Sequence, residues 1–231
     1  MWAFVTLAIL AATLLVNWKR SGRSFGSFMG LGTVRLYARL WHGCTFPAPL
    51  DVPARGGALV VVNHTSSPDG CFVQCGCRRG MTFLVADDFF QPRLLWIWAT
   101  TACVPVTRKG FDVRAAREGL RRLLEGRVVV VFPEGTLSGA GLRSRTPKCG
   151  AAFLALHSDV PVYPAFISGG PQHPDVLTGW FLPPRKRVRI VYGQPLDLTP
   201  YRNRPINRAL LEEVTAFFMR QIFALDPAKR P

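Results

Sequence analysis

Residues 58–70 read ALVVVNHTSSPDG and decide how the rest of the chain is interpreted. The apolar run that opens this stretch is typical of a strand buried on both faces, and we assign a strand to Ala58–Asn63. A second motif, FPEGT at residues 132–136, follows the all-valine run 128–131 in the same way. Both motifs therefore lie at strand ends, where ligands bind in open α/β sheets.

The first motif supplies a histidine and a carboxylate, His64 and Asp69, five residues apart. This spacing is about 140° off on a helix of 3.6 residues per turn, so a turn must bring the two side chains together. A Ser or Thr among residues 65–67 is predicted to cap a following helix, with Pro68 at its first position. Asp69 would then face back toward His64, as a base and its orienting carboxylate require.

Composition limits the remaining possibilities. A chain of 231 residues that is 48% apolar can bury one sizeable core, so one globular domain is expected. The formal charge of +15 calls for an anionic partner, which could be nucleic acid, a membrane surface or a phosphorylated substrate.

The N-terminus favours the membrane among these partners. Residues 2–16 are apolar except for Thr6 and Thr13, and Trp18, Lys19 and Arg20 follow. The stretch is short for a perpendicular span and lacks the marks of a removed signal peptide, so we predict a retained anchor or an interfacial helix rather than a buried core helix. Residues 1–24 would be the anchor and hinge, residues 25–231 the domain, and the basic flank places that domain on the cytoplasmic face.

Residues 28–41 are predicted to form an amphipathic helix, because apolar residues alternate there with Arg35 and Arg39. Its basic residues suit anionic headgroups, and its apolar side could enter the membrane interface or pack on the core. The sequence leaves both arrangements open.

From residue 58 onward, apolar runs alternate with helical stretches, which is typical of βα units. We predict an α/β fold with a mainly parallel sheet flanked by helices, preceded by the membrane-anchoring helical segment. The predicted strands are Ala58–Asn63, Met81–Ala86, Ala102–Val106, Val128–Phe132, Val160–Phe166 and Val188–Tyr192. The predicted helices are Pro68–Cys77, Pro92–Thr100, Val113–Glu125, Cys149–His157 and Asn207–Leu225.

Four blocks now stand in order: residues 63–69 (NHTSSPD), 104–108 (VPVTR), 132–136 (FPEGT) and 160–164 (VPVYP). In this order and spacing they resemble the glycerolipid acyltransferase family with its His-x4-Asp motif, whose best-known members are bacterial 1-acylglycerol-3-phosphate acyltransferases. The resemblance covers residues 58–169. Such enzymes act in phospholipid biosynthesis.

The resemblance implies transfer of a fatty acyl group from acyl-CoA or acyl carrier protein to the hydroxyl of a lysophospholipid. The favoured reaction converts 1-acylglycerol-3-phosphate to phosphatidic acid. The resemblance also implies membrane lipids as partners, no cofactor beyond the acyl-donor substrate, and no nucleic-acid partner. The alternatives are an acyltransferase for another lysolipid, such as a lyso-ornithine lipid, and a catalytically silent membrane-binding protein. No Gly-x-Ser-x-Gly elbow is present, so direct transfer is expected.

The resemblance also assigns roles to residues. His64 would be the general base and Asp69 its orienting partner, and Arg108 would hold the phosphate of the acceptor. The chain has Leu137 where the family usually has Arg, so a phosphate cation is missing there. The predicted substrate-binding residues are Arg108, Glu134, Gly135, Thr136, Arg143, Arg145 and Lys148, with Glu134 in a structural role. No metal site is predicted, because no His or fourth Cys accompanies Cys71, Cys75 and Cys77 at a zinc-ligand spacing.

Overall fold

A six-stranded sheet forms the centre of the protein, which we describe from a computed structural model. The structure describes residues 13–16, 18–19, 25–87, 103–107, 112–135, 146–173, 175–183 and 187–229. The strand order is β3-β2-β4-β1-β5-β6, and every neighbouring pair is parallel except β5 and β6. The strands are β1 (Ala58–Val62), β2 (Met81–Ala86), β3 (Val104–Val106), β4 (Val128–Val131), β5 (Val162–Ser168) and β6 (Arg189–Tyr192).

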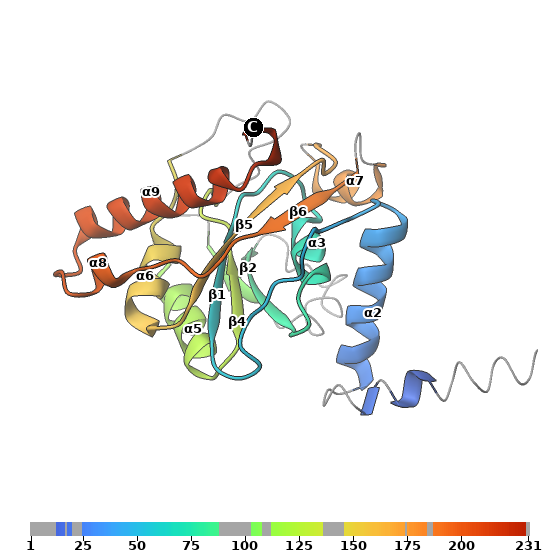
Figure 1. Ribbon diagram of the computed structural model, residues 1–231, viewed down its shortest axis with the longest axis horizontal. Helices are drawn as coiled ribbons and strands as arrows, with labels where there is room; N and C mark the ends of the chain where they lie inside the picture. Colours follow the sequence, from blue (N-terminus) through green and yellow to red (C-terminus); the bar gives the residue numbers. More distant parts are fainter. Residues whose placement is uncertain are drawn as a thin grey trace, which may run out of the picture.

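Helices cover both faces of the sheet, which makes three layers (Figure 1). One face carries α3 with α2 outside it, and the other carries α5, α6 and α9. The helices are α2 (Phe25–Leu40), α3 (Asp69–Cys75), α5 (Val113–Leu124), α6 (Gly150–Ser158), α7 (Val176–Phe181), α8 (Thr199–Arg202), α9 (Arg208–Ala224) and the 3-10 helix η3 (Pro227–Lys229).

Strand β1 lies between β4 and β5 and is buried along its whole length. Its side chains alternate between two hydrophobic cores, because successive residues of a strand point to opposite faces. Val60 and Val62 pack with α3, whereas Leu59 and Val61 pack with α5, α6 and α9. A residue that follows β1 directly therefore starts from a fully buried strand at the centre of the sheet.

The predicted mainly parallel α/β sheet is confirmed, and the described strands begin and end within two residues of their predicted bounds. The helices α7 and α8 were not predicted, because each is short and has little apolar periodicity. The predicted helix Pro92–Thr100 lies outside the described residues, as does most of the predicted anchor in residues 1–24. None of the helices in the described ranges is both long enough and apolar enough to cross a bilayer.

Helix α2 packs on the core along one side, which is one of the two arrangements left open for residues 28–41. Ala38 is fully buried in the core, and Arg35 donates a hydrogen bond to the carbonyl oxygen of Cys77 at 2.7 Å. The opposite stripe is apolar and exposed, and it consists of Phe25, Met29, Leu36 and Leu40, which are 42–76% exposed. One side of the helix therefore packs on the domain, and the other presents hydrophobic side chains outward.

Candidate active site

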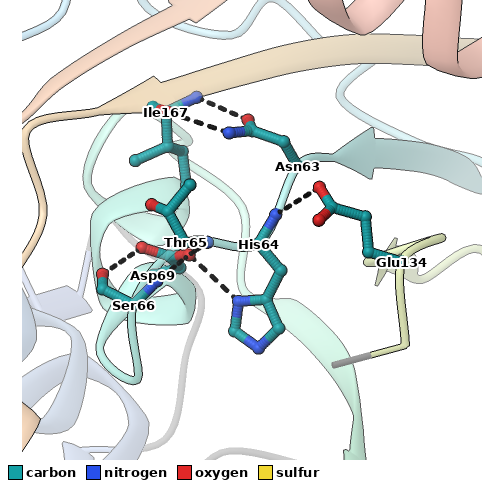
Figure 2. A network of polar contacts seen from close by, with 7 residues as sticks. All are labelled: Asn63, His64, Thr65, Ser66, Asp69, Glu134 and Ile167. Carbon is teal, nitrogen blue, oxygen red and sulfur yellow. Dashed lines mark hydrogen bonds and ion pairs between the residues drawn. The ribbon is translucent and has the colours of Figure 1, made fainter. Parts of the chain in front are cut away.

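The site lies where the carboxyl ends of three neighbouring strands meet, β4, β1 and β5. Asn63, directly after β1, joins two of these strands (Figure 2). Its side-chain amide donates to the carbonyl oxygen of Ile167 at 2.9 Å and accepts from the Ile167 N–H at 2.7 Å. Asn63 thus replaces one step of the β1–β5 ladder with a side chain, and it fixes the point at which His64 leaves the sheet.

Glu134, which follows β4, holds the backbone of His64. Its carboxylate accepts a hydrogen bond from the His64 N–H at 3.1 Å, and the side chain is buried, with 3% of its surface exposed. The His64 ring stacks on the ring of Phe132, with centroids 4.2 Å apart. The structural role predicted for Glu134 agrees with this geometry, because its carboxylate orients His64 through the main chain rather than through the imidazole.

Asp69 is the centre of the hydrogen-bond network and is completely buried. Its Oδ2 atom accepts from Nδ1 of His64 at 3.0 Å and from the backbone N–H groups of Thr65 at 2.7 Å and Ser66 at 2.9 Å. The Ser66 hydroxyl donates to Oδ1 of the same carboxylate. Charged acceptors are tolerated at such depth only when several donors surround them, and here four donors do.

The predicted capping arrangement of this turn is wrong in one respect. Helix α3 begins at Asp69 itself, with Pro68 at the N-cap, and no side chain caps the helix. The Ser66 side chain is not available as a cap because its hydroxyl binds Asp69 instead. The expected outcome still holds, since Asp69 lies in the first turn and faces back toward His64 (Figure 2).

This geometry fixes the roles of the two imidazole nitrogens. A carboxylate only accepts hydrogen bonds, so the His64 nitrogen that contacts Asp69 must carry the hydrogen. The neutral ring then has its lone pair on Nε2. The His64 side chain is 22% exposed, whereas that of Asp69 is 0% exposed. The site can therefore present a basic nitrogen at its surface while the orienting charge stays buried.

A second part of the site follows β4 and contains Gly135 and Lys148. Gly135 has a φ of 65°, and a Cβ atom there would lie 2.9 Å from Cδ of Lys148. The Lys148 N–H also donates to the carbonyl oxygen of Pro133 at 2.7 Å. The positive φ is what favours glycine at 135, because the Lys148 side chain is flexible and could move away from a Cβ atom. The structure thus brings Glu134, Gly135 and Lys148 of the predicted substrate-binding set together.

The other predicted substrate-binding residues, Arg108, Thr136, Arg143 and Arg145, lie outside the described residues. Within the described ranges, no three His, Cys, Asp or Glu side chains are arranged to hold a metal ion.

Sequence reasoning missed Ser66, Asn63 and the Phe132 ring, which stacks on His64, as contributors to the site. Ser66 was considered only as a cap, and the bridging role of Asn63 was not foreseen. The signal for Asn63 was its position, because a buried amide next to the last strand residue needs partners from a neighbouring strand.

Comparison with known proteins now places the chain. A family model described as Acyltransferase matches residues 45–168, more than half of the sequence, and this range contains the whole His64–Asp69 network. The chain belongs to this acyltransferase family.

Similar proteins with curated sequences include N-acylphosphatidylethanolamine synthase of Arabidopsis thaliana, which is 29% identical over 158 residues, 60% of this chain. An uncharacterized protein of Mycobacterium leprae is 24% identical over 208 residues, 73% of this chain. The chain spans about half the length of these relatives, 55% and 54% respectively.

The fold is also similar to a solved structure, that of the 1-acyl-sn-glycerophosphate acyltransferase PlsC from Thermotoga maritima. The TM-score is 0.64 at 20% sequence identity, and the match covers 96% of this chain and 91% of the solved one. At this level of identity the likeness extends to the fold, including the sheet whose carboxyl edge carries the site described above.

Proposed function

We propose that this protein is an O-acyltransferase that moves a fatty acyl group from a thioester, acyl-CoA or acyl carrier protein, to the hydroxyl of a lysophospholipid. The favoured acceptor is 1-acylglycerol-3-phosphate, and the product is then phosphatidate. The observation that carries the proposal is the hydrogen bond from Nδ1 of His64 to the buried Asp69 carboxylate, within the region that matches the family.

The proposed reaction is a direct transfer. Nε2 of His64 removes the proton from the acceptor hydroxyl as its oxygen attacks the thioester carbonyl carbon. The carbon–sulfur bond then breaks, and the proton passes from His64 to the leaving thiolate. Asp69 remains ionised throughout and stabilises the imidazolium that forms between these steps, in the way known for the carboxylate of a Ser-His-Asp triad.

Recognition of the acceptor phosphate would fall to Arg108, with help from Arg143, Arg145 and Lys148. An arginine is suited to this task because its guanidinium forms two parallel hydrogen bonds with a phosphate. Lys148 already lies against Gly135 beside the His64 backbone anchor, which supports a phosphate position on this side of the site.

A second acceptor class is favoured by two observations. Leu137 stands where the family usually has Arg, and one relative is named for the synthesis of N-acylphosphatidylethanolamine. An acceptor other than a phosphate monoester, such as a lyso-ornithine lipid or another zwitterionic lipid, would not need the missing cation.

A substrate panel separates these acceptors. The purified 231-residue protein is assayed with each of two acyl donors, a long-chain acyl-CoA and an acyl carrier protein thioester. The acceptors are lysophosphatidate, zwitterionic lysolipids and phosphatidylethanolamine. We expect the highest kcat/KM with lysophosphatidate. Higher kcat/KM with a zwitterionic acceptor would favour the second class, and no transfer to any acceptor would leave a silent membrane-binding protein as the explanation.

Substitution of Arg108 tests the phosphate assignment directly. Arg108→Ala should raise the KM for lysophosphatidate at least about tenfold and leave the KM for the thioester nearly unchanged, because the lost contact is to the acceptor. Arg108→Lys should recover only part of the affinity, and Lys109→Ala, which removes the neighbouring charge, is the matched control. A rise in the thioester KM instead would reassign Arg108 to the donor.

We further propose that the protein works at an anionic lipid surface. The exposed apolar stripe of α2 (Phe25, Met29, Leu36 and Leu40) supports this, because soluble surfaces rarely leave such a row uncovered. Arg39 lies in the same turns, exposed, and the net charge of +15 complements anionic headgroups.

Vesicle binding tests this second proposal. The double variant Leu36→Ser, Leu40→Ser should bind vesicles containing anionic lipid several-fold more weakly than wild type, whereas Ile206→Ser, at an exposed apolar position outside α2, should not. Thermal stability should change little in either variant, because the side chains are exposed. Equal binding by all three proteins would remove α2 from the membrane contact.

A further inference from the structure

Three aromatic side chains connect α2 to α7, two elements far apart in the sequence. The Tyr37 hydroxyl donates to the carbonyl oxygen of Trp180 at 2.6 Å, and the two rings stack with centroids 5.6 Å apart. His42, just after α2, is only 1% exposed, and its Nε2 atom lies 2.8 Å from the Tyr37 hydroxyl oxygen. In Figure 1, α7 lies next to the end of α2 that these residues occupy.

The donor and the acceptor of each hydrogen bond in this cluster can be assigned. A tyrosine hydroxyl has one hydrogen, and Tyr37 gives it to Trp180, so its oxygen must accept from Nε2–H of His42. In the neutral His42 ring the lone pair is then on Nδ1, a buried atom without a hydrogen-bond partner in the described part of the chain. Burial lowers the pKa of His42, which keeps the ring neutral.

Both ends of this cluster reach the loop that carries the candidate base. The His42 ring makes a T-shaped contact with the ring of Phe72, with centroids 5.0 Å apart. Phe72 lies in α3, three residues after Asp69. On the other side, Gly179 precedes Trp180 and lies so close to the loop that a Cβ atom there would be 2.9 Å from Oγ of Ser67. The loop between His64 and Asp69 is thus bordered by α3 and by the backbone of α7.

From these contacts we infer that Tyr37 and His42 are positioning residues for the His64–Asp69 loop. Acting through Trp180 and Gly179, they hold α7 against Ser67 and so keep Asp69 where it orients the imidazole of His64. The inference rests on the acyltransferase activity proposed above. It also ties the helix with the exposed apolar stripe to the loop of the candidate base.

Tyr37→Phe is the sharpest test, because it keeps the ring and its stack on Trp180 and removes only the hydroxyl. The matched control is Ser158→Ala, which removes another buried hydroxyl that donates to a backbone carbonyl, that of Leu154 at 2.6 Å, on the opposite face of the sheet. We expect kcat to fall about tenfold in Tyr37→Phe, with the KM of both substrates within twofold of wild type. Ser158→Ala should retain the wild-type kcat.

Hydrogen–deuterium exchange gives a second readout that does not depend on activity. Peptides covering residues 64–72 and 176–182 should exchange faster in Tyr37→Phe than in wild type, and at the wild-type rate in Ser158→Ala. Unchanged kcat and exchange in Tyr37→Phe would overturn the inference, and so would equal losses in both variants. A wild type inactive on every lysolipid would refute the proposed function alone, because the exchange comparison still reports on the loop.

Discussion

The two edges of the sheet differ in what their polar side chains bind. At the carboxyl edge, the side chains of His64, Asp69 and Ser66 bind one another, and those of Asn63 and Glu134 bind neighbouring backbone. At the amino edge, the side chain of Arg79 joins its own loop, which precedes β2, to the loops that precede β1 and β4. Arg79 donates to the carbonyl oxygens of Pro53 at 2.7 Å and Gly56 at 2.8 Å, and to that of Gly126.

The carboxyl edge has side chains suited to proton transfer, whereas Arg79 at the amino edge holds loops together. The contacts of Arg79 end on carbonyl groups, which cannot take up or release protons, so they join only the segments that lead into β1, β2 and β4. The carboxyl edge leaves a partly exposed imidazole in contact with a buried carboxylate, an arrangement that can move a proton. Substitutions at the two edges should therefore affect different measurements.

The largest expected effect is at the carboxyl edge. His64→Ala should lower kcat for acyl transfer by about 10³-fold, the usual contribution of a positioned general base, while the far-UV circular dichroism spectrum remains unchanged. His157→Ala, at an exposed histidine on α6, is the control and should retain full activity. Near-normal turnover by His64→Ala would exclude His64 as the base and remove the proposed distinction between the edges.

The amino edge should show the reverse pattern. Arg79→Ala should lower the free energy of unfolding by about 2 kcal/mol, because a charged donor to several carbonyl groups is lost, and should leave kcat within twofold of wild type. Arg55→Ala removes the same charge from an exposed position in the adjacent loop and should change stability by less than about 0.5 kcal/mol. Denaturant unfolding and the transfer assay measure the two quantities. A large drop in kcat without a loss of stability would show that the edges are not separate.

A smaller effect concerns pH and again distinguishes the carboxyl side. Burial lowers the pKa of His42 below its ordinary value of 6.5. Just below pH 6.5 the imidazole therefore binds a proton in the unfolded chain but not in the folded chain. The stability contributed by neutral His42 is complete above pH 6.5 and falls as the pH drops below it, by at most about 1.4 kcal/mol per pH unit. The titratable group in contact with His42 is the Tyr37 hydroxyl, whose pKa is raised by burial, so it stays protonated throughout this range.

Denaturant unfolding between pH 7 and 5 checks this expectation. His42→Gln retains an N–H donor for Tyr37 and should flatten the pH dependence in this window. Hydrogen bonds lower the pKa values of Asp112 (from the Ala115 N–H) and Glu118 (from Arg121), so these carboxylates lose their stabilising charge only at more acidic pH. An identical pH dependence in wild type and His42→Gln would assign the effect to other groups.

The sequence alone determined the architecture and the principal pair of the site. Runs such as residues 58–62 and 128–131 are buried on both faces, and such runs occur in parallel sheets whatever the surrounding loops do. His64 and Asp69 could be paired from the sequence because a turn of five residues is a local structure, whose geometry depends on the residues within it. Four ordered blocks then identified the family, which the family match confirms.

Tertiary structure decided what depends on contacts between distant segments. Asn63 is hydrogen-bonded to Ile167, 104 residues away, and Tyr37 to Trp180, 143 residues away. No periodicity in the sequence encodes such partners. The same holds for the two sides of α2, because the pattern of residues 25–40 shows which residues are apolar but not which of them α3 will cover. A local pattern fixes how a segment folds, whereas the partners of its side chains are fixed only when the strands and helices pack together.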